Sequence, residues 1–209
     1  MCLYCLSSGL LHFDQSVFTY NLGMGAEIQV PSPMFLIEHP RGLVLFETGL
    51  DPAVAGDPVS YWGEPSNAWR PILTPEQTIV PQLARLGFEP RDVKYVIMSC
   101  LIRDHAGGMK RFPDATFVVQ AAELREAWWP SPATLAIMRW AYCQADLAPT
   151  RRFRFIQLEG EDYDVFGDGK VVALSSPLPR QRRAGRRRAP AQHRHGAATR
   201  RGDATAAQL

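Results

Sequence analysis

The chain has 209 residues, of which 46% are hydrophobic, and it carries a formal net charge of +2. This length suits one globular domain, or one domain with a fragment. No apolar run approaches the roughly 18 residues that a membrane-spanning helix needs. Residues 1–13 lack the basic leader and the small-residue cleavage site of a secretory signal peptide. We therefore expect no membrane segment, a cytoplasmic location and reduced cysteines.

The charge is distributed unevenly along the chain. Residues 177–209 contain nine arginines and one acidic residue, whereas residues 1–176 carry 14 basic and 20 acidic side chains, a balance of −6. The arginine-rich segment has no apolar periodicity from which a core strand or helix could form. We predict a folded domain over residues 1–176 and a disordered basic tail over residues 177–209.

The first half of the chain contains a hairpin pattern and a helix pattern. Two apolar runs, residues 34–37 and 43–46, are separated by turn-forming residues and predict a β-hairpin. Residues 51–71 are rich in Pro, Gly and Trp and predict a long surface loop. Thr74 followed by Pro75 predicts the start of a helix that continues to Gly87.

In the second half, strand patterns alternate with helix patterns. The predicted strands are residues 93–98, 116–120, 153–158, 164–166 and 171–174, and the predicted helices are residues 121–129 and 134–142. Alternation of this kind is typical of layered domains in which helices cover a sheet. The fold class that the sequence predicts is therefore α/β (α+β).

The most informative stretch is residues 99–108, which follow the predicted strand 93–98 and read Ser-Cys-Leu-Ile-Arg-Asp-His-Ala-Gly-Gly. This stretch resembles the S-H-x-H-x-D-H-x-G-G signature of the metallo-β-lactamase superfamily. The matching positions are Ser99, Asp104, His105, Gly107 and Gly108. Residues 34–49, 86–93 and 120–129 look like the corresponding segments of the acyl-homoserine lactonase branch, so the resemblance covers about residues 30–176.

The resemblance implies both a fold and a chemistry. The fold would be an αββα sandwich, incomplete here because the chain departs from the family after residue 176. The family binds two zinc ions that lower the pKa of a shared water and polarise the carbonyl that it attacks. The implied substrate is a small-molecule lactone or a related ester.

The signature is damaged in this chain. Cys100 and Ile102 stand where the family has its first two histidines. A thiolate can bind zinc at about 2.3 Å, but an isoleucine cannot bind it. The resemblance therefore implies at most one zinc, held by Asp104 and His105 with Cys100 as a substitute ligand, and Asp104 as the catalytic residue.

Three alternatives stay open for these residues. Asp104 and His105 can instead be hydrogen-bonded loop residues, because two ligands hold zinc poorly without a third. Cys100 can be a plain buried cysteine, or a nucleophile with His105 as its base. Glu47 replaces the aspartate of the family's D-T-G and lengthens the arm that supports the metal loop.

Other candidate ligands carry weaker patterns. His12 and His39 are expected to be surface or loop residues. Cys2 and Cys5 form a C-x-x-C pair without the second pair that a structural zinc site needs. We expect neither set to bind metal.

After residue 176 the family continues with a T-P-G-H segment, but this chain continues with Pro177 and stays basic. The codons possible for residues 191–198 allow a neighbouring frame that encodes a turn and an apolar strand, so we hypothesise a frameshift near Pro177. His193 and His195 imitate H-x-H, and residues 202–204 imitate the family's G-D-A turn; we take both as chance matches.

Three functional hypotheses follow. The first is a lactonase-type, metal-dependent hydrolase whose activity is impaired in this chain. The second is a non-catalytic pseudoenzyme or a frameshifted fragment. The third is a protein whose tail, with a net charge of about +8, binds nucleic acid. The tail contains no aromatic residue on which bases could stack, which weakens this third hypothesis.

Overall fold

The structure is a computed structural model that describes residues 1–19, 22–132 and 141–175, all of which belong to one unit, Met1–Leu178. The predictions made for residues 177–209 lie outside the described residues, as does most of the predicted helix 134–142. None of the described helices has both the length and the apolar character needed to cross a membrane.

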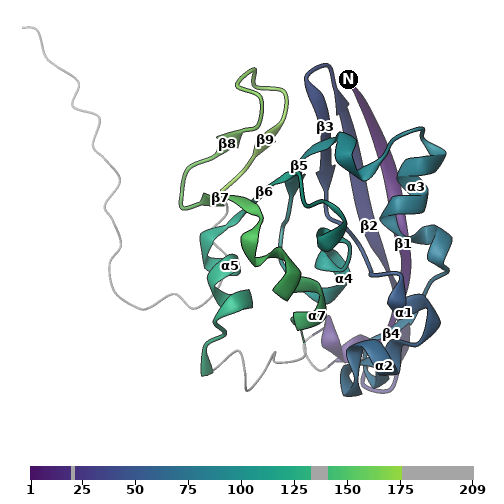
Figure 1. Ribbon diagram of the computed structural model, residues 1–209. Helices are drawn as coiled ribbons and strands as arrows, with labels where there is room; N and C mark the ends of the chain where they lie inside the picture. The colour runs from purple at the N-terminus through teal and green to yellow at the C-terminus, as the bar shows by residue number, and fades with distance from the viewer. Residues whose placement is uncertain (20–21, 133–140, 176–209) are drawn as a thin grey trace, which may run out of the picture. The chain divides into compact units, whose positions relative to one another are not determined.

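A seven-stranded mixed sheet organises the chain (Figure 1). Its strand order is β4-β1-β2-β3-β5-β6-β7. Strands β4, β1, β2 and β3 pair antiparallel, and β5, β6 and β7 continue the sheet parallel to β3. The strands are β1 (Cys2–Asp14), β2 (Glu27–His39), β3 (Gly42–Phe46), β4 (Arg70–Ile72), β5 (Val93–Ile97), β6 (Thr116–Gln120) and β7 (Arg154–Leu158).

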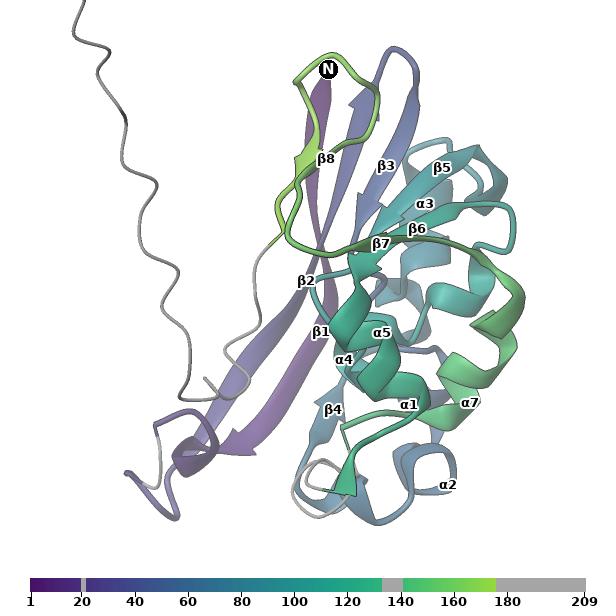
Figure 2. The same ribbon diagram turned by 90° about the vertical axis from the view of Figure 1, so that its left-hand side faces the viewer.

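Helices cover one face of this sheet, and a small hairpin lies over the other face (Figure 2). The α-helices are α1 (Ala53–Gly56), α2 (Pro58–Trp62), α3 (Ile79–Arg85), α4 (Arg103–Ala106), α5 (Ala121–Trp128) and α7 (Gln144–Leu147). The 3-10 helices are η1 (Gln15–Val17), η2 (Glu64–Asn67), η3 (Pro75–Gln77), η4 (Pro90–Asp92), η5 (Met109–Arg111) and η6 (Ala148–Arg152). The hairpin pairs β8 (Tyr163–Asp164) with β9 (Val172–Ala173).

The main core lies between the sheet and the helices. Because successive strand residues point to opposite faces, alternate side chains serve the two sides of the sheet. The helix side takes Leu36, Leu45, Val96 and Phe117, and the hairpin side takes Ile37, Val44, Ile97 and Val118. The helix side therefore holds the larger cluster of buried residues, and the hairpin side holds two smaller ones.

Much of the predicted secondary structure is confirmed. The hairpin is β2–β3, the strand 93–98 is β5, and residues 121–129 correspond to α5. Thr74 and Gln77 form a capping box at η3, which leads into α3. The predicted α/β (α+β) class is confirmed, with helices packed against a multistranded sheet.

One prediction about the first half is wrong, and one long strand was not predicted. Residues 51–71 are not a plain surface loop, because they contain α1, α2, η2 and the start of β4. Trp62 and Trp69 from this stretch are buried in a second core together with Phe13. Phe13 comes from β1, a 13-residue strand that the sequence analysis did not predict. The tryptophans follow no helix or strand period in the sequence. Their burial results from tertiary contacts with β1, which a local pattern does not predict.

Candidate functional site

The signature residues lie directly beyond the carboxyl end of β5, in residues 99–108, which we call the motif loop. Two buried carboxylates accept hydrogen bonds from its backbone. Ser99 N donates to Glu47 Oε1 at 2.8 Å, and Leu101 N donates to Glu123 Oε1 at 3.0 Å. The four-residue helix α4 follows and carries Asp104 and His105. Asp104 and His105 are therefore both held at the rim of the sheet.

The two glycines allow the motif loop to approach the segment that follows β3. A Cβ atom on Gly107 would overlap Asp51 N and would lie 2.8 Å from Gly49 O, so only a hydrogen fits there. Across the same contact, Thr48 N donates to His105 O at 2.9 Å, and Gly49 forms a parallel bridge with Ala106. The double glycine thus has a packing role that needs no metal.

His105 lies between two carboxylates. Its Nδ1 is 3.2 Å from Glu47 Oε2, and its Nε2 is 3.5 Å from Asp104 Oδ2. Burial acts to lower the pKa of His105, but the Cys100 side chain and the two carboxylates outweigh it and raise this pKa to about 11. The carboxylates on either side therefore favour the protonated imidazole.

Asp104 and Glu47 complete this group. Burial raises the pKa of Asp104, and the neighbouring His105 charge opposes that rise. The backbone carbonyl of Asp104 accepts a hydrogen bond from Ser32 Oγ at 2.8 Å. Among the described residues, Glu47 is the one non-glycine residue with a positive φ, 62°. Such a conformation is uncommon outside glycine and tends to occur at functional sites.

The described side chains around His105 do not form a recognisable metal site. In residues 1–19, 22–132 and 141–175, no cluster of three or more His, Cys, Asp or Glu side chains is arranged to hold a metal ion. Ile102 offers no ligand atom, and His105 is engaged by carboxylates at both ring nitrogens. The arrangement does not fit the metal centre that the resemblance implies, so the ligand set Cys100, Asp104 and His105 gains no support from the geometry.

A second charged group, the Lys110 cluster, was not predicted from the sequence. Lys110 Nζ lies 2.9 Å from Asp51 Oδ2 and 3.1 Å from Asp146 Oδ1. Tyr61 donates to Asp146 Oδ1 at 2.6 Å. Burial acts to lower the pKa of Lys110, but the two carboxylates raise it overall, which keeps the amine charged. Lys110 comes two residues after the double glycine, and this closeness to the signature is the sequence feature from which the cluster could have been predicted.

Arg103 points away from the Asp104 group into an aromatic environment. Its guanidinium carbon lies 4.9 Å from the centroid of the Trp62 ring and 5.8 Å from that of Trp69. Arg103 and Trp62 border a cavity of about 750 Å³ whose walls also include Tyr61, Tyr142 and Cys143. The cavity adjoins the motif loop at Arg103, and Asp104 is not among its lining residues.

The remaining candidates lie apart from this site. His12 is paired with Glu27 at 3.2 Å. The expectation that His39 is a surface or loop residue is wrong, because the side chain is 1% exposed and pairs with Asp168 at 3.0 Å. Cys2 and Cys5 are exposed free thiols, whereas Cys100 is a half-buried free thiol.

Comparison with known proteins decides the family. No protein-family model matches the chain. The N-acyl homoserine lactonase AttM of Agrobacterium fabrum is 37% identical over 181 residues, which cover 84% of this chain and 66% of that protein. The chain belongs to the N-acyl homoserine lactonase branch of the metallo-β-lactamase superfamily.

Other members of the lactonase branch agree. An N-acyl homoserine lactonase of Bacillus cereus is 29% identical over 164 residues, covering 78% of this chain and 61% of that protein. The chain thus spans about two thirds of the length of these relatives.

Solved structures show the same fold. A structure of an N-acyl homoserine lactone hydrolase, with the product N-hexanoyl-L-homoserine bound at its catalytic metal centre, matches 78% of this chain and 61% of its own, with a TM-score of 0.66 at 29% identity. The dizinc lactonase AidC matches 78% of this chain and 60% of its own, with a TM-score of 0.51 at 16% identity, and supports the fold alone. The predicted resemblance to the metallo-β-lactamase fold is confirmed.

Proposed function

We propose that this chain is a lactonase-type hydrolase of small-molecule lactones or related esters, and that its activity is strongly impaired. The observation that carries this proposal is the half-preserved motif loop. Asp104, His105 and the two glycines occupy the rim of a lactonase fold, while Cys100 and Ile102 replace two imidazoles. The names of the relatives support the substrate class.

The described residues support only a weak chemistry of their own. We assign Asp104 as the catalytic residue, whose raised pKa suits a general base that takes a proton from an attacking water. The charged ring of His105, 3.5 Å from the Asp104 carboxylate, would stabilise the negative charge that develops on the lactone oxygen. General acid–base catalysis contributes about 10²–10⁴-fold, which is far below the acceleration of most enzymes.

A second candidate function is that of a non-catalytic member of the family. The ion pairs of His105 with Glu47 and Asp104 favour it, because they give both signature residues a structural role. Cys100 as a nucleophile with His105 as its base stays an alternative within the hydrolase proposal. The upper limit of one zinc and the cytoplasmic location also stay predictions from the sequence.

The frameshift belongs to the same proposal. It rests on the sequence alone, in which the family's T-P-G-H segment is replaced by an arginine-rich run after residue 176. Reading the nucleotide sequence in the neighbouring frame tests it, because a frame without apolar strand patterns would exclude a frameshift. Salt-dependent retention of duplex DNA on a filter would favour the nucleic-acid alternative instead.

The proposal is tested by restoring the signature. The double variant C100H/I102H provides H-x-H beside Asp104 and His105. We expect it to hydrolyse N-hexanoyl homoserine lactone, with added zinc, at least about 100-fold faster than the wild type. The conservative double variant C100S/I102V serves as the matched control and should stay at the wild-type rate.

Two outcomes would contradict the proposal. A wild-type rate that matches the restored variant would show that the activity is not impaired. If the wild type and D104N both hydrolyse the lactone no faster than the uncatalysed reaction, the non-catalytic candidate would be favoured.

A further inference from the structure

The cavity that Arg103 borders, which we call the Arg103 cavity, lies between α2 and η2 on one side and α7 on the other. Its volume of about 750 Å³ falls within the range of about 300–1,000 Å³ that is usual for small-molecule sites. The described residues that form its walls belong to helices and to the segments that flank them, and none of these residues is in a strand. The cavity is therefore built by the helical layer of the domain.

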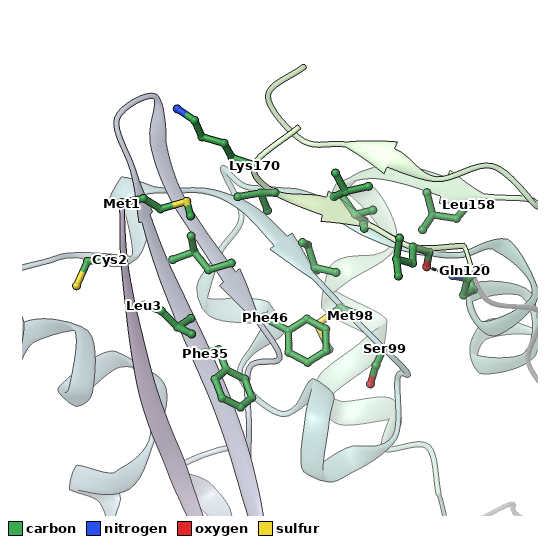
Figure 3. Close-up of a pocket in the computed structure, with 17 residues that line it drawn as sticks. Met1, Cys2, Leu3, Phe35, Phe46, Met98, Ser99, Gln120, Leu158 and Lys170 are labelled. Atoms are coloured by element: carbon green, nitrogen blue, oxygen red, sulfur yellow. Dashed lines mark hydrogen bonds between the residues drawn. The ribbon is translucent and has the colours of Figure 1, made fainter. Parts of the chain in front are cut away.

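A cleft of similar size lies on the other side of the sheet, beside residues 170–174 (Figure 3). Its lining includes Leu3, Phe35, Phe46 and Val118. In an αββα sandwich this is the inner face of the sheet, because the helices cover the other face. The chain spans only about two thirds of the length of its relatives, whose remaining part covers this face. Its apolar surface is therefore a packing face and marks no ligand site.

The wall of the Arg103 cavity is aromatic rather than aliphatic. It contains the rings of Tyr61, Trp62 and Tyr142. Among the described residues that line it, none is Leu, Ile, Val, Met or Phe. An alkyl chain would find no long aliphatic side chain there, whereas a flat ring can stack on these aromatic side chains or meet them edge to face. The lining therefore favours an aromatic ligand.

The two charged residues of the lining differ in burial. Arg103 is 3% exposed, whereas Glu64 of η2 is exposed. The guanidinium carbon of Arg103 lies 4.9 Å from the centroid of the Trp62 ring. A guanidinium matches the geometry of a carboxylate and also stacks on aromatic rings. The charges of Asp146 and Asp104 already reach Arg103, so a ligand carboxylate would contribute less to binding than an aromatic ring.

Contacts outside the cavity hold two of its aromatic side chains in place. The Tyr61 hydroxyl donates to Asp146 Oδ1 at 2.6 Å and accepts a hydrogen bond from Lys110 Nζ. The Tyr142 hydroxyl donates to Glu123 Oε1 at 3.0 Å. Side chains that are already ordered lose little conformational entropy when a ligand binds between them. The aromatic wall is therefore preorganised.

We propose that the Arg103 cavity binds an aromatic carboxylic acid, with the ring against Trp62 and Tyr142 and the carboxylate at Arg103. The aromatic wall, the buried cation and the absence of long aliphatic side chains among the described lining residues all support this class of ligand. The inference does not rest on the proposed function, because none of the side chains that line the cavity is assigned to hydrolysis.

The test uses the full chain and three probes, measured by isothermal titration calorimetry. The first is trans-cinnamate. Cinnamyl alcohol keeps the aromatic ring and lacks the charge, and 3-cyclohexylpropionate keeps the charge and lacks the aromatic ring. We expect one cinnamate per chain, with the alcohol bound about three- to ten-fold more weakly because it lacks the ion pair. The cyclohexyl acid should bind at least about five-fold more weakly than cinnamate, because it cannot stack.

Three variants locate the binding site. Ala145 is exposed and lines the cavity, so Ala145→Trp should preserve the fold and weaken cinnamate at least about ten-fold by steric clash. Ala122→Trp places the same side chain on an exposed position of α5 outside the cavity and should leave cinnamate binding unchanged. Arg103→Gln should remove the preference for cinnamate over cinnamyl alcohol.

Several results would overturn the proposal. One is absence of saturable cinnamate binding, and another is equal affinity of the wild type for the three probes. Cinnamate binding that Ala145→Trp leaves unchanged would place the site elsewhere. The thermal unfolding midpoint of each variant shows whether it folds. If Ala145→Trp or Arg103→Gln does not fold, the three-probe comparison in the wild type decides by itself.

Discussion

Glu47 Oε2 lies 3.2 Å from His105 Nδ1, so a carboxylate that follows the hairpin holds the histidine of the motif loop. The other oxygen of Glu47 accepts the hydrogen bond from Ser99 N at 2.8 Å. The Glu47 side chain thus binds the backbone at the start of the motif loop and also pairs with the imidazole ring of His105. The carboxylate of Glu47 therefore occupies the space beside His105 Nδ1.

The first prediction concerns the pKa of His105. Replacing Glu47 by Gln removes one of the negative charges that raise this pKa to about 11, so the pKa should fall. Titration of the ring nitrogens by NMR measures it. Glu27→Gln removes the partner of His12 and should leave His105 unchanged. An unchanged His105 pKa in E47Q would contradict the ion pair.

The second prediction concerns stability as a function of pH. The pKa of His105 is raised on folding from 6.5 to about 11, so its contribution to stability is present below about 6.5 and is lost as the pH rises toward 11. The free energy of unfolding should therefore fall over this window, and the fall should be smaller in His105→Gln. Urea unfolding at several pH values measures both slopes. Equal slopes in the two proteins would show that His105 is not protonated in the folded chain.

The third prediction concerns the double glycine. Gly107→Ala places a methyl group against Asp51 N and Gly49 O, which belong to backbone and cannot move aside, so we expect a loss of about 3 kcal/mol or more. Gly56→Ala is the control, because a Cβ atom there meets nothing within 4 Å. That substitution, in α1, should be neutral or slightly stabilising. Equal unfolding midpoints for the two variants would refute the close approach.

The fourth prediction concerns the Lys110 cluster. Lys110→Met leaves Asp51 and Asp146, which are 2% and 1% exposed, without their shared amine. Breaking a buried pair in this way costs about 3–5 kcal/mol. Arg125→Met removes an ion pair in which both side chains are about 70% exposed, and it should change stability by less than about 1 kcal/mol. Comparable losses in the two variants would show that the cluster is not a buried network.

The parts of the molecule that the sequence could predict are those with local patterns. The hairpin β2–β3, the capping box at Thr74 and the strand β5 each depend on neighbouring residues, and the motif loop follows from one contiguous stretch. The burial of Trp62 and the partners of Lys110 could not be predicted in this way. Asp51 and Asp146 are 95 positions apart in the chain and meet only through the folded sheet and its helices.

His39 and His105 show the same limit at the level of single residues. His39 lies in the turn-like stretch 38–42, yet the hairpin that contains Asp168, 129 residues later, covers it. The sequence predicted His105 as a ligand because its neighbours match the signature. Its partner Glu47 has a positive φ and lies 58 positions earlier in the chain, and no local pattern predicts this pairing.

The measurement that tests this account most directly is the zinc affinity of the full chain, compared with that of C100H/I102H. Both proteins are freed of metal, titrated with zinc against a competing chelator, and analysed for bound metal. We predict no stoichiometric zinc in the wild type and one zinc ion per chain in the restored variant, because the two added imidazoles and Asp104 then supply three ligands on the motif loop. Stoichiometric, tight zinc in the wild type would contradict the account, since His105 could not then be held as a charged ring between Glu47 and Asp104.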